Sequence, residues 1–167
     1  VNTRRASCIG TASSRVDTIE HLMSALHGMQ IDNAVIQVDG PEIPILDGSA
    51  LPWAEAIIAA GIEEQRALAR EFVVRDPIVL RDGDSWIIAT PPTTNCLKVS
   101  CATYYEQALP GSHAVTLSAS SSEYLTAIAP ARTYGFIHEV EALLAAGLAR
   151  GGSLDNALII YEDRYSS

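Results

Sequence analysis

Glu20 and His21 are neighbours at the start of a stretch with the spacing of an amphipathic helix. A neutral imidazole binds zinc, and a nearby carboxylate can take a proton from a metal-bound water. Adjacent helical residues point about 100° apart, so one side chain could bind a metal while the other reaches its water. The residues alone leave a second interpretation open, in which Glu20 completes a capping box and His21 is a solvated surface residue.

The other histidines do not extend this pair into a metal site by their spacing. His27 comes six residues after His21 and lies on a different helix face, unlike the two histidines of an H-E-x-x-H motif. We expect His113 in a loop and His138 at the start of a helix, both at the surface. The sequence therefore offers one candidate metal ligand, His21.

A second segment whose side chains could take part in catalysis or binding reads ARTYGF, at residues 131–136, between Pro130 and a predicted helix. A hydroxyl here, from Thr133 or Tyr134, could donate a hydrogen bond to a developing oxyanion, and an exposed aromatic ring could pack against a sugar or an acyl chain. The alternative is a polar linker with two core aromatics. Asp47 and Ser49 are predicted to cap and brace a helix, and the absence of G-x-S-x-G argues against a Ser-His-Asp triad.

Hydrophobic spacing predicts helices in the first part of the chain and short strands after it. The first helix is predicted over 18–27, with Asp17 as its N-cap and Gly28 at its end. The second is capped by Ser49 and ends at Gly61. Predicted strands cover 33–38, 72–74, 78–80, 86–88 and 96–103, with a turn at Asp82-Gly83. Helical spacing returns over 122–129 and 137–146.

The polar stretch 63–66 separates two predicted α+β domains, 1–68 and 69–167. One short pattern recurs in both: residues 31–36 read IDNAVI and residues 154–159 read LDNALI, each after a predicted helix. Self-similarity of this kind indicates a duplicated module, although six positions can also recur by chance. The first residue is not Met, and the last apolar strand has nothing after it to cover it. We therefore expect an internal fragment of a longer protein.

Composition excludes several classes of partner. The net charge of -9 argues against nucleic acid or an anionic membrane as the main partner. No apolar run approaches the ~20 residues of a membrane span, and the N-terminus lacks a secretory pattern. Three cysteines, an odd number, indicate unpaired thiols in a reducing compartment, so we expect a cytoplasmic protein in which Cys8, Cys96 and Cys101 are small buried apolar residues.

Five segments, in the same order, resemble the zinc-dependent UDP-3-O-acyl-N-acetylglucosamine deacetylases of lipid A biosynthesis. They are TIEHLMSAL (18–26), IDNA (31–34), EIPILDGSA (42–50), ARTYGF (131–136) and GLARGGSLDNA (147–157). The likeness covers nearly the whole chain. It implies an α+β fold of two similar α/β-sandwich domains packed face to face, both incomplete in this chain, with the active site in the cleft between them.

The resemblance also implies an activity. Enzymes of this family use one Zn²⁺ to remove the N-acetyl group from a UDP-linked 3-O-acyl glucosamine, a small-molecule substrate. By position, His21 resembles the first zinc ligand, Glu20 the general base and Thr133 the residue that stabilises the oxyanion. Tyr134 stands where the family commonly has Phe and is expected to contact substrate.

The family's other two zinc ligands, in a His-Lys-x-x-Asp motif, and its general-acid histidine have no match in these residues. The chain alone is therefore expected to be inactive. A different class of function that the residues leave open is a non-catalytic α+β binding or assembly module.

Overall fold

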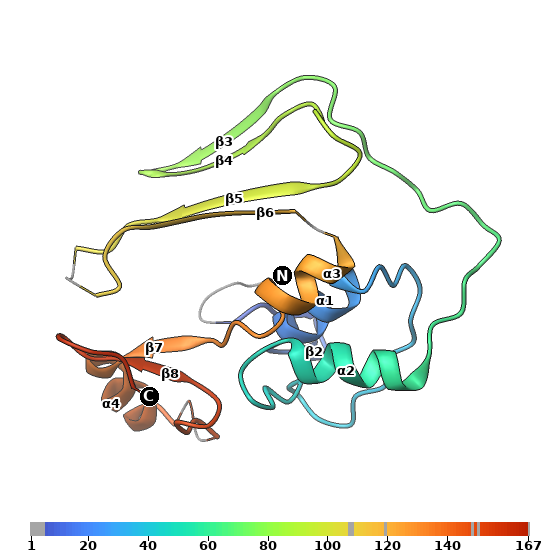
Figure 1. Cartoon of the computed structure of the whole chain (residues 1–167). Helices are drawn as coiled ribbons and strands as arrows, with labels where there is room; N and C mark the ends of the chain where they lie inside the picture. Colours follow the sequence, from blue (N-terminus) through green and yellow to red (C-terminus); the bar gives the residue numbers. More distant parts are fainter. Residues whose placement is uncertain (1–5, 107–108, 119, 148, 150, 167) are drawn as a thin grey trace.

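The structure, a computed structural model, describes residues 6–106, 109–118, 120–147, 149 and 151–166. Residues 1–5 of the predicted first domain, and Leu148 and Arg150 of the 147–157 segment, lie outside these ranges. Short helices and two-stranded sheets make up the described part, which confirms the α+β class (Figure 1). The helices are α1 (Glu20–Gly28), α2 (Leu51–Ala60), α3 (Ser121–Glu123), the π-helix η1 (Tyr124–Ile128) and α4 (Ile137–Ala145).

The described strands form pairs rather than one large sheet. Three pairs are antiparallel and β7 pairs with β8 in parallel, with α4 in the connection between them, as a parallel pair requires. Gly83, at a φ of +57°, lies in the tight turn between β3 and β4, where a turn is predicted. The strands are β1 (Ile9–Gly10), β2 (Arg15–Val16), β3 (Ile78–Asp82), β4 (Ser85–Ala89), β5 (Lys98–Thr103), β6 (His113–Ser118), β7 (Tyr134–Phe136) and β8 (Leu158–Ile160).

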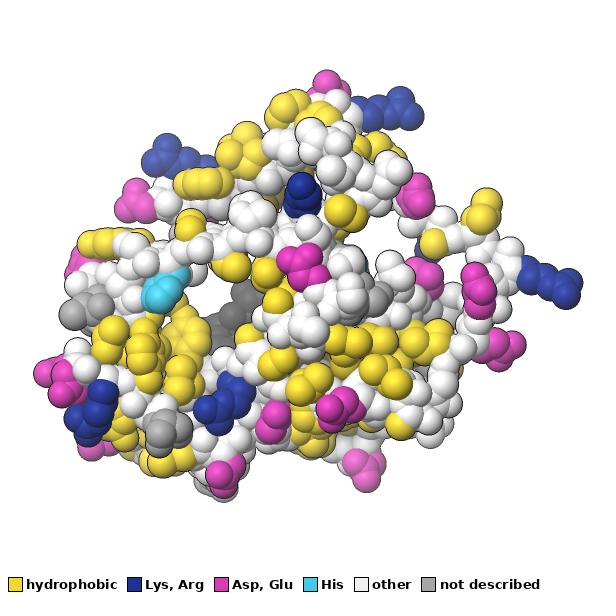
Figure 2. Space-filling view, in the orientation of Figure 1, with side chains coloured by type: hydrophobic (Ala, Val, Ile, Leu, Met, Phe, Trp, Pro, Cys, Tyr) yellow, Lys and Arg dark blue, Asp and Glu magenta, His cyan; other side chains and the backbone are white. Residues whose placement is uncertain are grey.

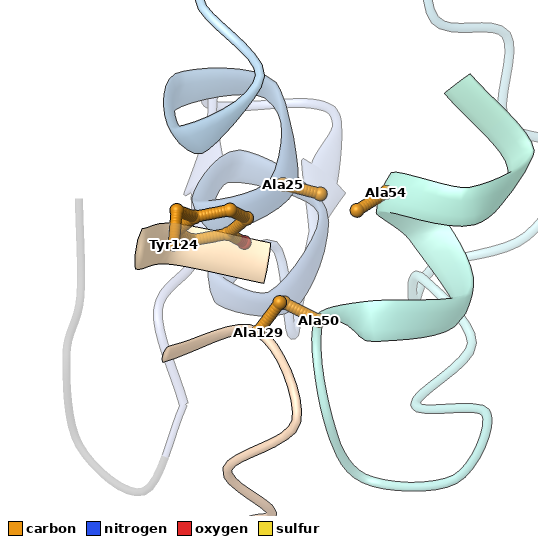
Figure 3. Close-up of a cluster of buried hydrophobic side chains, with 5 residues drawn as sticks. All are labelled: Ala25, Ala50, Ala54, Tyr124 and Ala129. Atoms are coloured by element: carbon orange, nitrogen blue, oxygen red, sulfur yellow. The ribbon is translucent and has the colours of Figure 1, made fainter. Parts of the chain in front are cut away.

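The buried core lies where η1 meets the α1–α2 pair. Ala25 of α1 and Ala54 of α2 are fully buried, and their small side chains let the two helices approach closely (Figure 3). Tyr124 of η1 completes the cluster, and its hydroxyl is 3.0 Å from Ser24 Oγ. Burial raises the pKa of the Tyr124 phenol. The core therefore joins residues from both sides of the boundary predicted at residue 68, a boundary that stays a prediction.

Gly28, at the end of α1, packs directly under the ring of Tyr124. A Cβ at this position would lie 2.3 Å from Tyr124 Cδ1 and 2.4 Å from Cγ. Because Cγ is at the root of the ring, the side chain cannot swing its far end away. The collision therefore outweighs the helix-propensity gain of about 1 kcal/mol that Ala offers over Gly.

We expect Gly28→Ala to lower the free energy of unfolding of the chain by about 1–3 kcal/mol, the cost of overpacking a core, as measured by urea denaturation. Gly40→Ala is the matched control, because no atom lies within 4 Å of a Cβ built there. Gly28→Ala should lower the free energy of unfolding by less in a Tyr124→Ala background, where the ring that it meets is absent. Equal stability of the Gly28 and Gly40 variants would contradict this packing.

The predicted capping box at the start of α1 is wrong. The helix begins at Glu20, after Ile19, and no side chain caps it. Asp17 forms a β-bridge with Glu42, and its carboxylate accepts a hydrogen bond of 2.5 Å from Arg15 Nε. Thr18, at a φ of 58°, turns the chain between that bridge and the helix. Pairing with the 41–43 segment has thus taken the residue that local spacing assigned to the cap.

Two predicted strands, 33–38 and 72–74, are also wrong. Both segments lack ladder partners among the described residues, so their β-forming side chains stay solvated: Val35 is 91% exposed and Phe72 is 84% exposed. A strand needs a neighbour for its backbone hydrogen bonds, which apolar residues alone cannot supply. Figure 1 shows the segment between α2 and β3 as an extended trace along the outside of the molecule.

Other predicted elements differ in detail. The helix predicted over 122–129 is divided into α3 and η1, whereas α4 matches the predicted 137–146. His113 begins β6 instead of lying in a loop. The three cysteines are unpaired, as expected, but Cys96 and Cys101 are exposed and only Cys8 is buried.

Apolar side chains are also exposed on the second pair of strands. Leu80, Trp86 and Ile87 are each more than 60% exposed. Figure 2 shows hydrophobic side chains gathered over the β3–β4 hairpin at the top of the view and over α2 at the lower right. None of the helices in the described ranges is long and apolar enough to cross a membrane.

Candidate active site

Glu20 is the first residue of α1 and is half-buried. Its Oε2 atom accepts a hydrogen bond of 3.0 Å from the backbone N–H of Ser7, in the segment before β1. This bond uses one of the two carboxylate oxygens and fixes the orientation of the group at the N-terminus of the helix. A carboxylate held in this way can present its other oxygen to a water molecule, as a general base must.

His21 is the second residue of α1 and is also half-buried, whereas His27 lies exposed in the last turn. Both are placed as predicted. Among the residues that the structure describes, no group of three His, Cys, Asp or Glu side chains is arranged to hold a metal ion. A catalytic zinc site normally uses three protein ligands and one open position. The described residues thus provide one candidate ligand, not a complete site.

Thr133 is half-buried and immediately precedes β7. Its N–H donates to the carbonyl of Gly48 at 2.8 Å, and its own carbonyl accepts from the N–H of Leu158 at 2.9 Å. The backbone of Thr133 is therefore held from two sides, by the loop before α2 and by the start of β8. A hydroxyl on so constrained a backbone suits the stabilisation of a charge that develops at one place.

The loop before α2 is braced by its own side chains, as predicted for Asp47 and Ser49, but the prediction that Ser49 caps the helix is wrong. Asp47 Oδ1 accepts from Ser49 N at 2.9 Å and from Ser49 Oγ at 2.8 Å. Ser49 Oγ also accepts from the N–H of Leu51 at 3.2 Å, and its residue is 1% exposed. The N-cap itself is Ala50, whose N–H donates to the carbonyl of Ala129 at 3.0 Å. The loop is thereby joined to the segment that leads to Thr133.

Tyr134 belongs to an exposed aromatic cluster. Its hydroxyl is hydrogen-bonded to the hydroxyl of Tyr105, and its ring meets Phe136 edge to face at 5.9 Å between centroids. Phe136 stacks on His138 at 5.4 Å. Spacing of two in a strand places Tyr134 and Phe136 on one face, a signal present in the sequence. Nothing local indicates Tyr105, which comes from the loop after β5.

The hydrogen bond to Tyr105, together with burial, raises the pKa of Tyr134 to about 12. A phenol whose folded pKa exceeds its ordinary value of 10.0 contributes stability that is complete below about pH 10 and is lost as the pH rises through 12. At neutral pH Tyr134 is therefore a neutral hydroxyl that can donate or accept a hydrogen bond.

We expect Tyr105→Phe to bring the pKa of Tyr134 back toward its ordinary value, because the bond that favours the protonated phenol is removed. The ultraviolet absorbance of tyrosinate, measured during an alkaline titration, follows this change. The difference between Tyr105→Phe and the double variant Tyr105→Phe/Tyr134→Phe isolates the Tyr134 curve. A Tyr134 midpoint that stays near pH 12 without Tyr105 would contradict the assigned cause.

The predicted site residues thus fall in two places. Glu20 and His21 lie at the start of α1, Thr133 immediately precedes β7, and Tyr134 is the first residue of that strand. Within the described ranges no hydrogen bond joins one pair to the other. They are connected through α2, which packs on α1 and whose preceding loop is bonded to Thr133.

The model of one protein family, described as UDP-3-O-acyl N-acetylglycosamine deacetylase (LpxC), matches residues 1–167. The chain belongs to this family. The resemblance inferred from the five sequence segments is therefore confirmed. The family match covers all four predicted site residues, although it does not test their roles.

Curated deacetylases of the family are similar to this chain along nearly its whole length. UDP-3-O-acyl-N-acetylglucosamine deacetylase from Acidithiobacillus ferrooxidans is 46% identical over 166 residues, which cover 98% of this chain and 54% of that protein. The proteins of the same name from Myxococcus xanthus and Syntrophus aciditrophicus are 41% and 39% identical over 97% and 98% of this chain. In both, the match covers 51% of the relative. The chain thus spans about half the length of these relatives.

Proposed function

We propose that this chain supplies part of the active site of a deacetylase that hydrolyses the N-acetyl group of UDP-3-O-acyl-N-acetylglucosamine, in lipid A biosynthesis. The observation that carries the proposal is the family match over residues 1–167, supported by relatives of that name at 38–46% identity. The substrate is then a small UDP-linked sugar, and the reaction takes place in the cytoplasm.

Amide hydrolysis needs one group that takes a proton from the attacking water and another that stabilises the oxyanion, and the site residues suit these two tasks. The Glu20 carboxylate, oriented by the N–H of Ser7, accepts a proton from the attacking water. The Thr133 hydroxyl, on a backbone held by Gly48 and Leu158, donates a hydrogen bond to the oxyanion that forms on the acetamide carbonyl. Tyr134 is 47% exposed and is available to contact the sugar or its acyl chain.

His21 is proposed as one ligand of a zinc ion. Zinc, when bound, would polarise the acetamide carbonyl and lower the pKa of a bound water. Two further ligands would have to join His21, since the described residues form no complete metal site. The different positions of Glu20 and His21 around the first turn of α1 allow one to bind metal and the other to face the water.

The finer architecture is also a proposal. We infer that residues 1–68 and 69–167 belong to two similar domains packed face to face, with the site between them. The recurrence of Asp-Asn-Ala at 32–34 and 155–157 supports this duplication. The contact between η1 and the α1–α2 pair joins residues of the two proposed domains and supports an interface between them.

A chimera of two chains tests the function. In this protein, called the chimera below, residues 1–167 replace the matching segment of the Acidithiobacillus ferrooxidans relative. We expect it to release acetate from UDP-3-O-acyl-N-acetylglucosamine at a rate within about tenfold of the relative's, since 46% of the matched positions are identical. A folded chimera with no acetate release would overturn the proposed function.

A further inference from the structure

We propose that Gly48 is a positioning residue for the reaction: its backbone sets where the Thr133 hydroxyl stands relative to α1 and α2. The proposal rests on the proposed function, because it assigns Thr133 the oxyanion contact. Three observations carry it: the hydrogen bond between the two residues, the space around Gly48, and the rigidity of the loop that holds it.

Gly48 and Thr133 are joined directly. The Gly48 carbonyl accepts the Thr133 N–H at 2.8 Å, and the Gly48 N–H donates to the carbonyl of Ile45 at 2.9 Å. The carbonyl of Thr133 in turn accepts the N–H of Leu158 at 2.9 Å. A displacement of the Gly48 peptide would therefore move the backbone that carries the Thr133 side chain.

Only glycine fits at this position. Gly48 has a φ of +83°, in the region that favours glycine, and a Cβ built there would lie 1.9 Å from the Asn156 carbonyl oxygen and 2.7 Å from its carbon. Asn156 cannot move away easily. Its Nδ2 donates to the Gly151 carbonyl at 2.8 Å, and its Oδ1 accepts the Ser153 N–H at 2.8 Å. The colliding atoms are backbone atoms, so a side chain at 48 must push the two segments apart.

The loop around Gly48 has little freedom to absorb that push. Asp47 and Ser49 brace each other on either side, and Ser49 is 1% exposed. The next residue, Ala50, belongs to the buried cluster and is bonded to Ala129. The position of Gly48 is thus fixed relative to α2, and through the packing of α2 on α1 it is fixed relative to Glu20. Gly48 therefore connects α1, which carries Glu20, to the segment that carries Thr133.

In the chimera we expect Gly48→Ala to lower kcat by about 10–10²-fold with KM changed by less than about threefold, since a misplacement of ~1 Å costs up to about that much in rate. Gly61→Ala is the matched control. Gly61 has a φ of +85°, but no atom lies within 4 Å of a Cβ built there, so this variant has the backbone strain without the collision. Its kcat should stay within about twofold of the unsubstituted chimera's.

The action through Thr133 is tested by combining variants. In a Thr133→Val background, Gly48→Ala should lower kcat by less than about threefold, because the donor it misplaces is already absent. If Gly48→Ala does not fold, Ser49→Ala provides the second test: it loosens the loop without filling space, and its loss of kcat should likewise vanish in the Thr133→Val background. A loss of kcat that persists there, or no loss in either single variant, would overturn the proposal.

Hydrogen exchange separates this inference from the proposed function, since it does not depend on turnover. The amide of Thr133 should exchange faster in Gly48→Ala than in Gly61→Ala, because its acceptor has moved. An unsubstituted chimera that folds but releases no acetate would defeat the proposed function, whereas faster exchange in Gly48→Ala would still show that Gly48 holds the Thr133 backbone. Unchanged protection of the Thr133 amide in Gly48→Ala would defeat the positioning role alone.

Discussion

Glu20→Gln in the chimera is expected to lower the rate of acetate release by about 10²–10⁴-fold, the usual cost of losing a general base. A glutamine amide cannot take a proton from water. Its carbonyl oxygen can still accept the Ser7 N–H that now bonds to Glu20 Oε2, so the start of α1 should keep its structure. The loss should appear in kcat, measured with saturating substrate.

Glu55→Gln is the matched control, because Glu55 is an exposed carboxylate on α2 with the same change of charge. Its turnover should equal that of the unsubstituted chimera. Near-normal turnover by Glu20→Gln would exclude Glu20 as the base and would leave its carboxylate with only the structural role of holding the Ser7 backbone.

Thr133→Val should lower kcat by about 10²–10³-fold, the cost of removing one oxyanion donor, and should raise KM far less. Valine has nearly the shape of threonine, and both backbone bonds of this residue are independent of its side chain. The hydroxyl acts on a charge that exists mainly in the transition state, so its loss should spare the binding of substrate.

Thr133→Ser provides the control for this prediction, because it keeps the hydroxyl and removes only a methyl group. Its kcat should remain well above that of the valine variant. An effect confined to KM in Thr133→Val would mean that this residue positions substrate and does not stabilise the oxyanion.

Hydrophobic spacing predicted the helices better than the strands, since the strands predicted over 33–38 and 72–74 do not form. The stripe of Ile19, Leu22 and Leu26 indicates α1 to within two residues at its start, because a helix makes its hydrogen bonds within itself. The segment 33–38 has the composition of a strand, but a strand also depends on a partner, whose position in the chain local composition does not give. The capping box failed for a similar reason, since Asp17 pairs with Glu42 and Arg15 instead.

The sequence predicted which residues form the candidate site and which elements they lie near, but not the contacts between them. Glu20 and His21 are placed at a helix start as expected, and the ARTYGF segment does present Thr133 next to a strand. The contacts that hold these residues could not be predicted. The bond between Thr133 and Gly48 spans 85 positions, and the Tyr105 contact of Tyr134 spans 29. Both pairings join segments that are far apart in the sequence, which no local spacing encodes.

Glu20 and His21 are adjacent, and a comparison of zinc content with turnover separates the role of one from that of the other. Zinc content and acetate release are to be measured on the same samples of the chimera, of Glu20→Gln and of His21→Gln. We predict about one zinc per chain in the chimera and in Glu20→Gln, and much less in His21→Gln, with normal turnover only in the unsubstituted chimera. Full zinc together with normal turnover in His21→Gln would exclude His21 as a zinc ligand.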